Sequence, residues 1–200
     1  MMGKGTVAAC LLALAALQLQ GCASAVIGAG ATVATAASEE RGLVGAARDT
    51  ETRIEINSLW LDCNEEMYRK VNLSVIEGRV LLSGIVPTQQ MRLDAVRLAW
   101  QAKGVKEVIN EIEVNDRAGI GTFARDSWIT AELKTRLLFD RQVQSINYSV
   151  ETVDGTVYLM GIAQDSGELD RVQSYARNLA YVRKVVNYVR LKDDPKRNRT

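Results

Sequence analysis

The chain alternates between two hydrophobic periods, and it does so twice. Apolar residues recur every three or four positions from 48 to 61 and again from 126 to 139, which is the spacing of an amphipathic helix. Each helical segment is followed by two alternating, β-prone runs, which meet at Glu77-Gly78 in one case and at Asp154-Gly155 in the other. An acidic residue and a glycine between two such runs favour a tight hairpin. We therefore expect strands at 71–76, 80–85, 146–153 and 156–162.

A second helix and a last strand complete each unit. Thr88 follows Pro87 as a candidate N-cap, and Asp165 with Glu168 three residues later forms a capping-box pattern. Gly104 would end the first of these helices, and Val-rich strands are expected at 105–114 and 182–191. The candidate N-caps of the first helices are Asp49 or Thr50 and Asp126 or Ser127. The buried stripes of the second helices are expected at Leu93, Val96 and Trp100 and at Leu169, Val172 and Leu179.

The order of elements is α-β-β-α-β in both units. This order predicts an α+β fold in which two helices pack on one face of a three-stranded mixed sheet. The units are copies of each other, because RDTETRIEINSLWLD from Arg48 matches RDSWITAELKTRLLFD from Arg125, and the hairpins repeat at the same offset of 77. The segments NLSV and NYSV match at a slightly shorter offset of 75. Ordered matches of this kind identify a tandem duplication.

Residues 1–21 have the features of a secretory signal peptide. Lys4 precedes an apolar run at 6–19, which is shorter than the roughly 20 helical residues that a bilayer core requires. The sequence LQGC at 19–22 resembles a bacterial lipoprotein box, in which the cysteine, here Cys22, is acylated. An ordinary secretory signal with a chance cysteine is the alternative. No aspartate follows Cys22, which among lipoproteins implies release to the outer membrane, so the protein would face the periplasm.

These features divide the chain into six segments. The uncharged, small-residue stretch at 23–37 could be a second membrane segment, but it is too short to span and is typical of a tether. We expect a signal peptide at 1–21, acylated Cys22 with its tether at 22–47, a first domain at 48–116, a linker at 117–124, a second domain at 125–192 and a basic tail at 193–200.

The composition removes several functions. The chain has 25 Lys+Arg, 24 Asp+Glu and no His, so it lacks imidazole chemistry and the basic excess of a nucleic-acid-binding protein. After export and acylation of Cys22, only Cys63 remains as a thiol. It is expected to be a small hydrophobe near a helix end, with a reactive thiol as the alternative. No activated hydroxyl or repeated acidic pair indicates catalysis. We therefore expect no enzyme activity, cofactor or metal.

The two units resemble the BON domain. That family places a glycine after the hairpin turn and another at the end of the second strand, where this chain has Gly78 and Gly84, and again Gly155 and Gly161. Two such units behind a lipoprotein signal are similar to the family's dual-domain outer-membrane lipoproteins, which are associated with division and envelope stress. The resemblance implies binding of anionic phospholipid and a role in outer-membrane integrity.

The same resemblance places the lipid contact on the first helix of the second unit, with Trp128 at the position of the family's membrane-contacting tryptophan. An indole in the first helical turn could lie at headgroup level, and copy one has Glu51 there instead. Arg125, Lys134 and Arg136 are the candidate phosphate partners. The helix start would add unsatisfied N–H groups.

The net charge of the second copy is more positive than that of the first, as binding of anionic lipid by the second copy would require. Residues 125–200 contain 13 basic and 10 acidic residues, whereas residues 48–117 contain 10 and 12. Asp126 and Glu132, however, flank Trp128 and would repel phosphate. The C-terminus adds Lys192, Lys196, Arg197 and Arg199.

Two alternatives stay open. Trp128 could cap a hydrophobic core, which is the role expected of Trp60 and Trp100. The protein could also be an envelope scaffold that contacts an outer-membrane assembly or division protein, with lipid only as its anchor.

Overall fold

The computed structural model describes residues 39–115 and 120–197. They belong to one compact unit, Glu39–Thr200. The expected signal peptide, the acylation site Cys22 and most of the expected tether lie outside the described residues, so they remain predictions. Within the described ranges, no helix combines the length and the hydropathy that a bilayer crossing requires.

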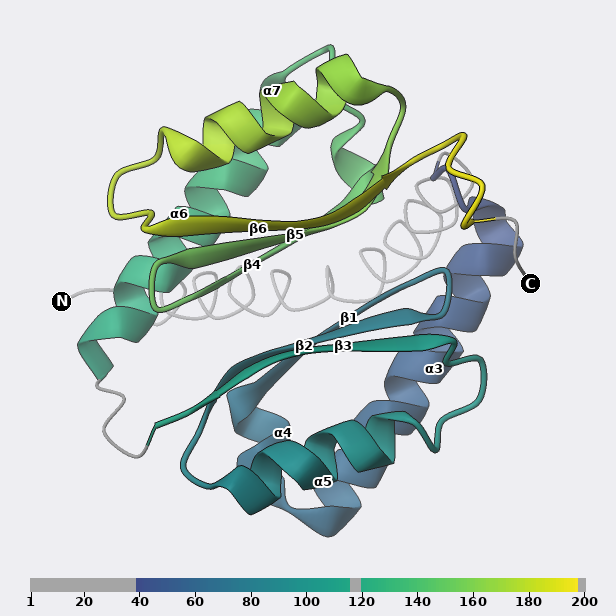
Figure 1. Cartoon of the computed structure of the whole chain (residues 1–200), viewed down its shortest axis with the longest axis vertical. Helices are drawn as coiled ribbons and strands as arrows, with labels where there is room; N and C mark the ends of the chain where they lie inside the picture. The colour runs from purple at the N-terminus through teal and green to yellow at the C-terminus, as the bar shows by residue number, and fades with distance from the viewer. Residues whose placement is uncertain (1–38, 116–119, 198–200) are drawn as a thin grey trace, which may run out of the picture. The chain divides into compact units, whose positions relative to one another are not determined.

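Each copy has the predicted order of elements with one short addition (Figure 1). The additions are the helix α4 in copy one and the 3-10 turn η2 in copy two, which precede the first strand of each sheet. Copy one contains α3 (Gly42–Cys63), α4 (Glu65–Lys70), β1 (Val71–Ile76), β2 (Arg79–Val86), α5 (Gln89–Ala99) and β3 (Glu107–Val114). Copy two contains α6 (Ile120–Phe139), η2 (Ser145–Asn147), β4 (Tyr148–Val153), β5 (Thr156–Ala163), α7 (Ser166–Arg177) and β6 (Lys184–Leu191).

Both sheets are three-stranded and mixed, which confirms the predicted α+β class. In copy one, β2 is the central strand, antiparallel to β1 and parallel to β3, and β5 is paired in the same way with β4 and β6. The registers Val71↔Gly84 and Tyr148↔Gly161 are related by an offset of 77. The NLSV/NYSV match at 75 is therefore wrong as a structural equivalence, and Asn72 corresponds to Ser149.

The two hairpin turns have the predicted geometry. Both central residues of each turn have positive φ, 56° and 75° at Glu77-Gly78 and 45° and 71° at Asp154-Gly155. Two successive left-handed residues define a type I′ turn, whose twist matches that of the paired strands. The acidic residue and the glycine thus form the tight hairpin turn that their order in the sequence predicts.

The N-cap prediction for the first helices is wrong. Helix α3 begins at Gly42 and α6 at Ile120, six residues before the predicted starts and, for α6, inside the expected linker. Asp49 and Asp126 consequently lie within helices. Their carboxylates instead accept the two backbone N–H groups of the hairpin turn, at 2.8 and 2.9 Å for Asp49 and at 2.7 and 2.9 Å for Asp126. The acceptor chemistry that suits an N-cap also suits a turn with two unpaired donors.

The N-caps of the second helices are confirmed. Thr88 Oγ1 accepts the N–H of Met91 at 3.2 Å, and Asp165 Oδ1 accepts that of Glu168 at 2.9 Å. The side chain of Glu168 does not complete the predicted capping box with the N–H of Asp165. It is buried and accepts the backbone N–H groups of Gln144 and Gln164 at 2.8 and 2.7 Å, so it ties the loop before η2 to the start of α7.

The core of copy one differs from the predicted stripe. Trp60 is fully buried and its Nε1 donates to the carbonyl of Ala95 at 3.1 Å, as expected of a core indole. Trp100, by contrast, is 52% exposed and Leu93 is also exposed, whereas Val96 is partly buried and packs against the core as expected. Helix α5 instead buries the stripe formed by Met91, Ala95, Leu98 and Ala99.

The predictions for the second helix of copy two and for Cys63 are each confirmed only in part. In copy two, Val172 and Leu179 are buried as expected, whereas Leu169 is only partly buried. Cys63 is the last residue of α3, as expected, but it is exposed rather than a buried hydrophobe. Gly84 and Gly161 have a packing reason for being glycine, since a Cβ there would lie 2.2 and 2.3 Å from the carbonyl oxygens of Lys70 and Asn147.

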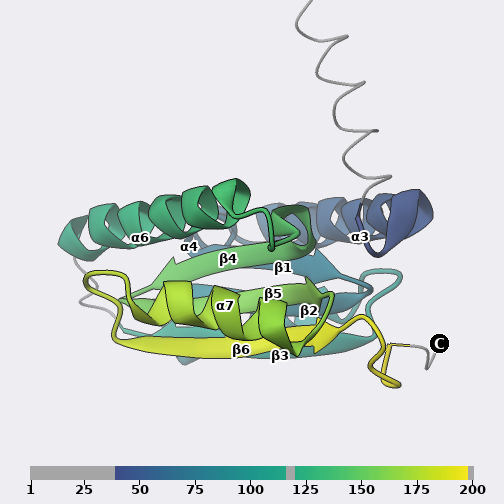
Figure 2. The same cartoon turned by 90° about the horizontal axis from the view of Figure 1, so that it is seen from above.

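The two sheets pack on each other through the faces that the helices leave free. Figure 1 shows the strands of both sheets between the helices of the two copies, and in Figure 2, turned by 90°, the two sheets lie one behind the other. A separate apolar cluster of Leu81, Val153, Tyr158 and Met160 joins them, and Ser74 Oγ and Ser149 Oγ lie 2.7 Å apart. Burial on both faces is why β2 and β5 are almost continuously apolar.

Candidate functional site

The surface around Trp128 is built by one side of helix α6. The helix buries Ile129, Leu133 and Leu137 against its sheet, and this stripe leaves the preceding position at the helix edge. Trp128 is 46% exposed there. The indole is therefore not sealed in the core, and it is not among the side chains that form the buried cluster of copy two.

Trp128 has an aromatic neighbour that the sequence analysis did not single out. The ring of Tyr181, in the turn between α7 and β6, meets it edge to face at 6.0 Å between centroids and 78° between planes. The guanidinium carbon of Arg125 lies over the same tyrosine ring, 5.1 Å from its centroid. Trp128, Tyr181 and Arg125, here called the aromatic patch, form one exposed cluster on copy two.

The backbone of Tyr181 is in an unfavourable conformation. Its φ is +68°, whereas its counterpart in copy one is Gly104, with a φ of +82°. A non-glycine residue in this left-handed region costs about 1 kcal/mol or more. The sequence signal was present, since the repeat places a tyrosine where copy one has the helix-ending glycine.

Arg125 is the site cation that the structure supports best. Within the described residues it forms no ion pair or hydrogen bond, and its guanidinium meets only the tyrosine ring. Nearby Arg183 is engaged, because it binds the carboxylate and the backbone carbonyl of Asp154. The patch therefore has one cation whose N–H donors are available.

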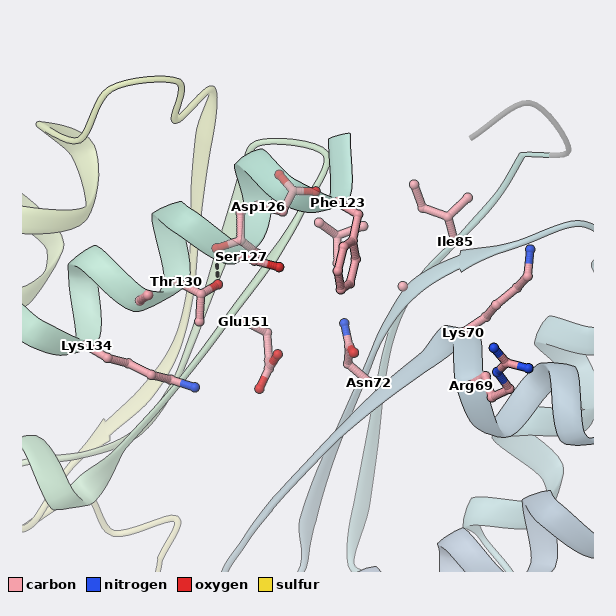
Figure 3. Close-up of a pocket in the computed structure, with 14 residues that line it drawn as sticks. Arg69, Lys70, Asn72, Ile85, Phe123, Asp126, Ser127, Thr130, Lys134 and Glu151 are labelled. Carbon is pink, nitrogen blue, oxygen red and sulfur yellow. Dashed lines mark hydrogen bonds between the residues drawn. The ribbon is translucent and has the colours of Figure 1, made fainter. Parts of the chain in front are cut away.

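The structure does not gather the other two predicted cations around Trp128. Lys134 lies six residues further along α6, about 120° around the helix, and points toward Glu151 (Figure 3). Arg136 is on the same side as Trp128 but is paired with Glu132 at 2.8 Å. Lys134 thus faces a different surface, and Arg136 is partly neutralised.

The two carboxylates expected to repel phosphate near Trp128, those of Asp126 and Glu132, are both engaged in the structure. The carboxylate of Asp126 is buried and satisfied by the hairpin turn, and that of Glu132 is paired with Arg136. The contribution expected from the helix N-terminus is also lost. Because α6 begins at Ile120, Trp128 lies in its third turn rather than its first.

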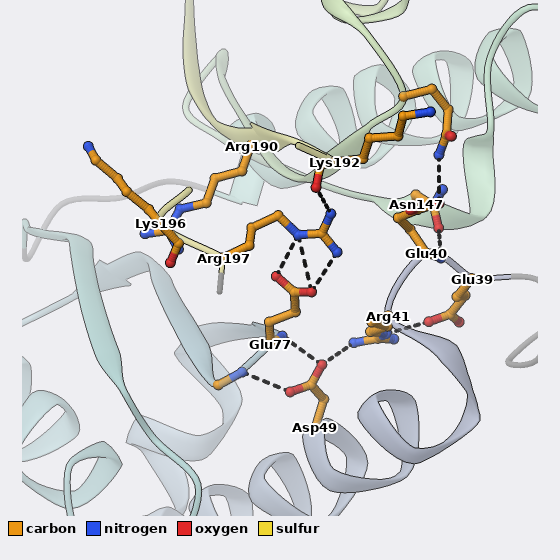
Figure 4. Close-up of polar contacts among 12 residues, drawn as sticks. Glu39, Glu40, Arg41, Asp49, Glu77, Asn147, Arg190, Lys192, Lys196 and Arg197 are labelled. Carbon is orange, nitrogen blue, oxygen red and sulfur yellow. Dashed lines mark hydrogen bonds and ion pairs between the residues drawn. The ribbon is translucent and has the colours of Figure 1, made fainter. Parts of the chain in front are cut away.

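The basic C-terminus is only partly free. Arg197 binds Glu77 of copy one at 2.8 Å, and this hydrogen-bonded carboxylate raises the pKa of the guanidinium above its usual value (Figure 4). Glu77 is the first residue of the turn that Asp49 holds, and Asp49 in turn binds Arg41 at 2.6 Å. Residues 193–197 thus connect the copies, which was not expected of a tail.

A cavity lies on the side of α6 that faces away from Trp128. It has a volume of about 620 Å³ and is lined by both copies, with Lys70 and Asn72 on one side and Phe123, Lys134 and Glu151 on the other (Figure 3). Burial raises the pKa of Glu151, and the nearby Lys134 opposes that shift. Among the described residues, no cluster of Cys, Asp or Glu side chains could hold a metal ion.

Known proteins place this fold in a family. The duplicated α-β-β-α-β fold defines a tandem α+β protein, and the BON domain profile matches residues 64–116 and 125–193. The chain belongs to the BON domain family.

Its relatives are similar to it over 70–90% of its length. A Haemophilus influenzae protein named "Outer membrane lipoprotein DolP" is 32% identical over 182 residues, which are 90% of this chain and 93% of that one. The "21 kDa hemolysin" of Actinobacillus pleuropneumoniae is 35% identical, covering 70% of this chain and 72% of its own. An Anaplasma centrale protein, "Uncharacterized protein in gshII 5'region", is 41% identical over 70% of this chain and 96% of its own.

Proposed function

We propose that this protein is a lipoprotein anchored to the outer membrane through Cys22, that it faces the periplasm, and that its second BON domain binds anionic phospholipid through Trp128 and Arg125. In this role it supports outer-membrane integrity as a binding protein rather than as an enzyme. The observation that carries the proposal is the half-exposed indole near an arginine whose side chain, within the described part of the chain, has a cation–π contact but no ion pair or hydrogen bond.

The chemistry of the patch suits a lipid headgroup region. An indole has an apolar body and a polar N–H, and such side chains concentrate where hydrocarbon meets water. A basic residue close to an anionic surface contributes about 1 kcal/mol. Both groups occur together on copy two, whereas copy one has the exposed Glu51 at the position of Trp128.

The anchor is supported by the sequence and by one relative. The LQGC sequence ending at Cys22 resembles a lipoprotein box, and the H. influenzae relative is named an outer-membrane lipoprotein. Acylation of Cys22 would hold the domains near a bilayer, which raises the local lipid concentration and lets a weak headgroup site be occupied.

The test compares two tryptophans of similar exposure. The protein lacking residues 1–22 is mixed with phosphatidylglycerol or phosphatidylcholine vesicles, and the bound fraction is measured by sedimentation. We expect selective binding to phosphatidylglycerol, and Trp128→Glu should weaken it more than about tenfold, since an indole is lost and a negative charge gained. The matched control is Trp100→Glu, which alters an indole of 52% exposure on copy one and should leave binding unchanged. Equal effects of the two substitutions contradict the assignment.

A second function is favoured by a different surface. Helix α3 exposes Ile54 and Leu61 seven residues apart, hence on one side of the helix, and this apolar surface suits contact with a protein. The scaffold alternative assigns it to an outer-membrane assembly or division protein. Under that alternative, Ile54→Glu abolishes capture of the partner, Trp128→Glu does not, and vesicle binding is absent.

A further inference from the structure

We propose that Tyr181 is a second lipid-contacting residue of the aromatic patch and that it positions Arg125 for the phosphate of an anionic headgroup. This inference rests on the proposed function. It assigns a role to a residue outside helix α6, in the turn before β6, and explains why a tyrosine occupies that turn.

The turn itself is the same in both copies. The N–H of Lys106 donates to the carbonyl of Gly78 at 2.8 Å, and that of Arg183 donates to the carbonyl of Gly155 at 2.8 Å. The backbone therefore requires a left-handed residue two positions before each donor. Gly104 meets that requirement freely, whereas Tyr181 meets it at the expense of backbone free energy.

Packing does not offset this unfavourable backbone conformation. The side chain of Tyr181 is 63% exposed and belongs to none of the hydrophobic clusters of the described residues. Its ring contacts are with Trp128 and Arg125. Residues with strained backbone conformations concentrate at binding sites. Because burial does not offset the strain at Tyr181, we attribute its ring to a binding role at the surface.

The two copies differ at both positions of this aromatic pair. Where copy two has Trp128 and Tyr181, copy one has Glu51 and Gly104. Both rings of the pair are thus missing from copy one, although Arg48, the counterpart of Arg125, is present there. The arginine is thus common to both copies, whereas the Tyr181 ring that contacts it and the Trp128 ring that meets Tyr181 are specific to copy two.

The contact leaves Arg125 able to bind phosphate. A guanidinium over a ring uses its face for the cation–π contact, while its N–H donors point outward in its plane and suit a phosphate. The Tyr181 ring also reduces the number of positions that a free arginine would sample, which lowers the entropy lost on binding.

The experiment replaces Tyr181 by residues that favour its backbone conformation. In the protein lacking residues 1–22, Tyr181→Gly restores the residue of copy one, and Tyr181→Asn keeps a side chain that tolerates the left-handed region. We expect both to weaken binding to phosphatidylglycerol vesicles about tenfold, with a shallower dependence on salt. The unfolding midpoint should stay the same or rise. Tyr181→Phe should bind as the wild type does. Tyr68→Ala, which removes an exposed tyrosine of copy one, is the matched control and should have no effect on binding.

The outcomes separate the inference from the function it rests on. If Trp128→Glu abolishes binding while Tyr181→Gly binds like the wild type, Tyr181 has no role and the proposed function stands. If Tyr181→Gly lowers the unfolding midpoint along with binding, its role is structural and the inference is overturned. If the wild type does not distinguish phosphatidylglycerol from phosphatidylcholine, both proposals are overturned.

Discussion

The two BON domains of this chain share the residues that hold the fold and differ in those at one surface. Asp49 and Asp126 secure their hairpin turns with the same pair of hydrogen bonds, and the strand registers agree at an offset of 77. At the edge of the first helix, however, copy one has Glu51 with Gly104, and copy two has Trp128 with Tyr181. The two copies thus share their framework and differ at two positions whose side chains are in contact in copy two.

This comparison distinguishes residues that hold the fold together from residues that form the candidate site. Trp60 is buried and bonded, whereas Trp128 is exposed beside a cation. Gly104 suits its turn, whereas Tyr181 strains it. Residues that serve the framework agree with their backbone and surroundings, and residues that deviate from that agreement mark the candidate site.

The largest expected effect tests the shared framework. Asp49→Ala and Asp126→Ala each leave two turn N–H groups without their acceptor, and we expect a loss of about 3 kcal/mol in unfolding free energy, measured by urea denaturation. Asp49→Ala should cost somewhat more, because Arg41 also loses one of its two carboxylate partners and keeps only Glu39.

Asparagine variants provide the control for this prediction. Asp→Asn at either position keeps one acceptor oxygen and should recover part of the loss. A loss below about 0.5 kcal/mol, the range of ordinary surface substitutions, would show that water replaces the carboxylate and that the turns do not depend on it.

The next effect tests whether the copies depend on each other. Leu81 is buried between the sheets, so Leu81→Ala should lower stability by about 2–3 kcal/mol. If the sheets fold as one unit, amide exchange in β5 of copy two should accelerate as much as exchange in β2. Leu138→Ala, at a side chain that is 67% exposed, should change stability little. Faster exchange confined to copy one would show that the domains are energetically independent.

Much of the fold could be predicted because its signals are local. The acidic-glycine turns, Thr88 and Asp165 each identify their element without distant residues. The errors arose where one residue type serves two purposes. The carboxylate of Asp126 suits both an N-cap and a hairpin turn, and the choice depends on a contact 28 residues away.

The candidate site was only partly predictable for a similar reason. Trp128 and Arg125 lie three residues apart on one helix, so the pattern brings them together. Tyr181 reaches them through the tertiary fold, and only the comparison with Gly104 could have indicated it. Lys134 was grouped with Trp128 by proximity in sequence, although helical spacing places it on a different face.

A smaller effect tests whether copy one can acquire the function. In the Trp128→Glu background, Glu51→Trp should restore binding to phosphatidylglycerol vesicles by less than about threefold, under 1 kcal/mol. Copy one supplies an arginine at position 48 but has Gly104 in place of the second ring. Glu51→Trp alone, with Trp128 intact, is the control. Full recovery would show that any exposed indole near the bilayer suffices and that the aromatic pair is unnecessary.

The smallest effect concerns Glu151, whose counterpart in copy one is the uncharged Ser74. Burial raises the pKa of Glu151 in the folded protein, with Lys134 opposing. The folded state then binds more protons than the unfolded state between the ordinary pKa of a glutamate and the raised one, so stability falls as pH rises through that window.

Glu151→Gln remains neutral, and at pH 7 it should be more stable than the wild type by a few tenths of a kcal/mol. This gain should vanish near pH 3, where the wild-type carboxyl is protonated in both states. Glu51→Gln, at an exposed position, is the matched control and should change stability little in urea denaturation. A gain that persists at pH 3 would mean that packing, and not the buried charge, distinguishes the two copies at this position.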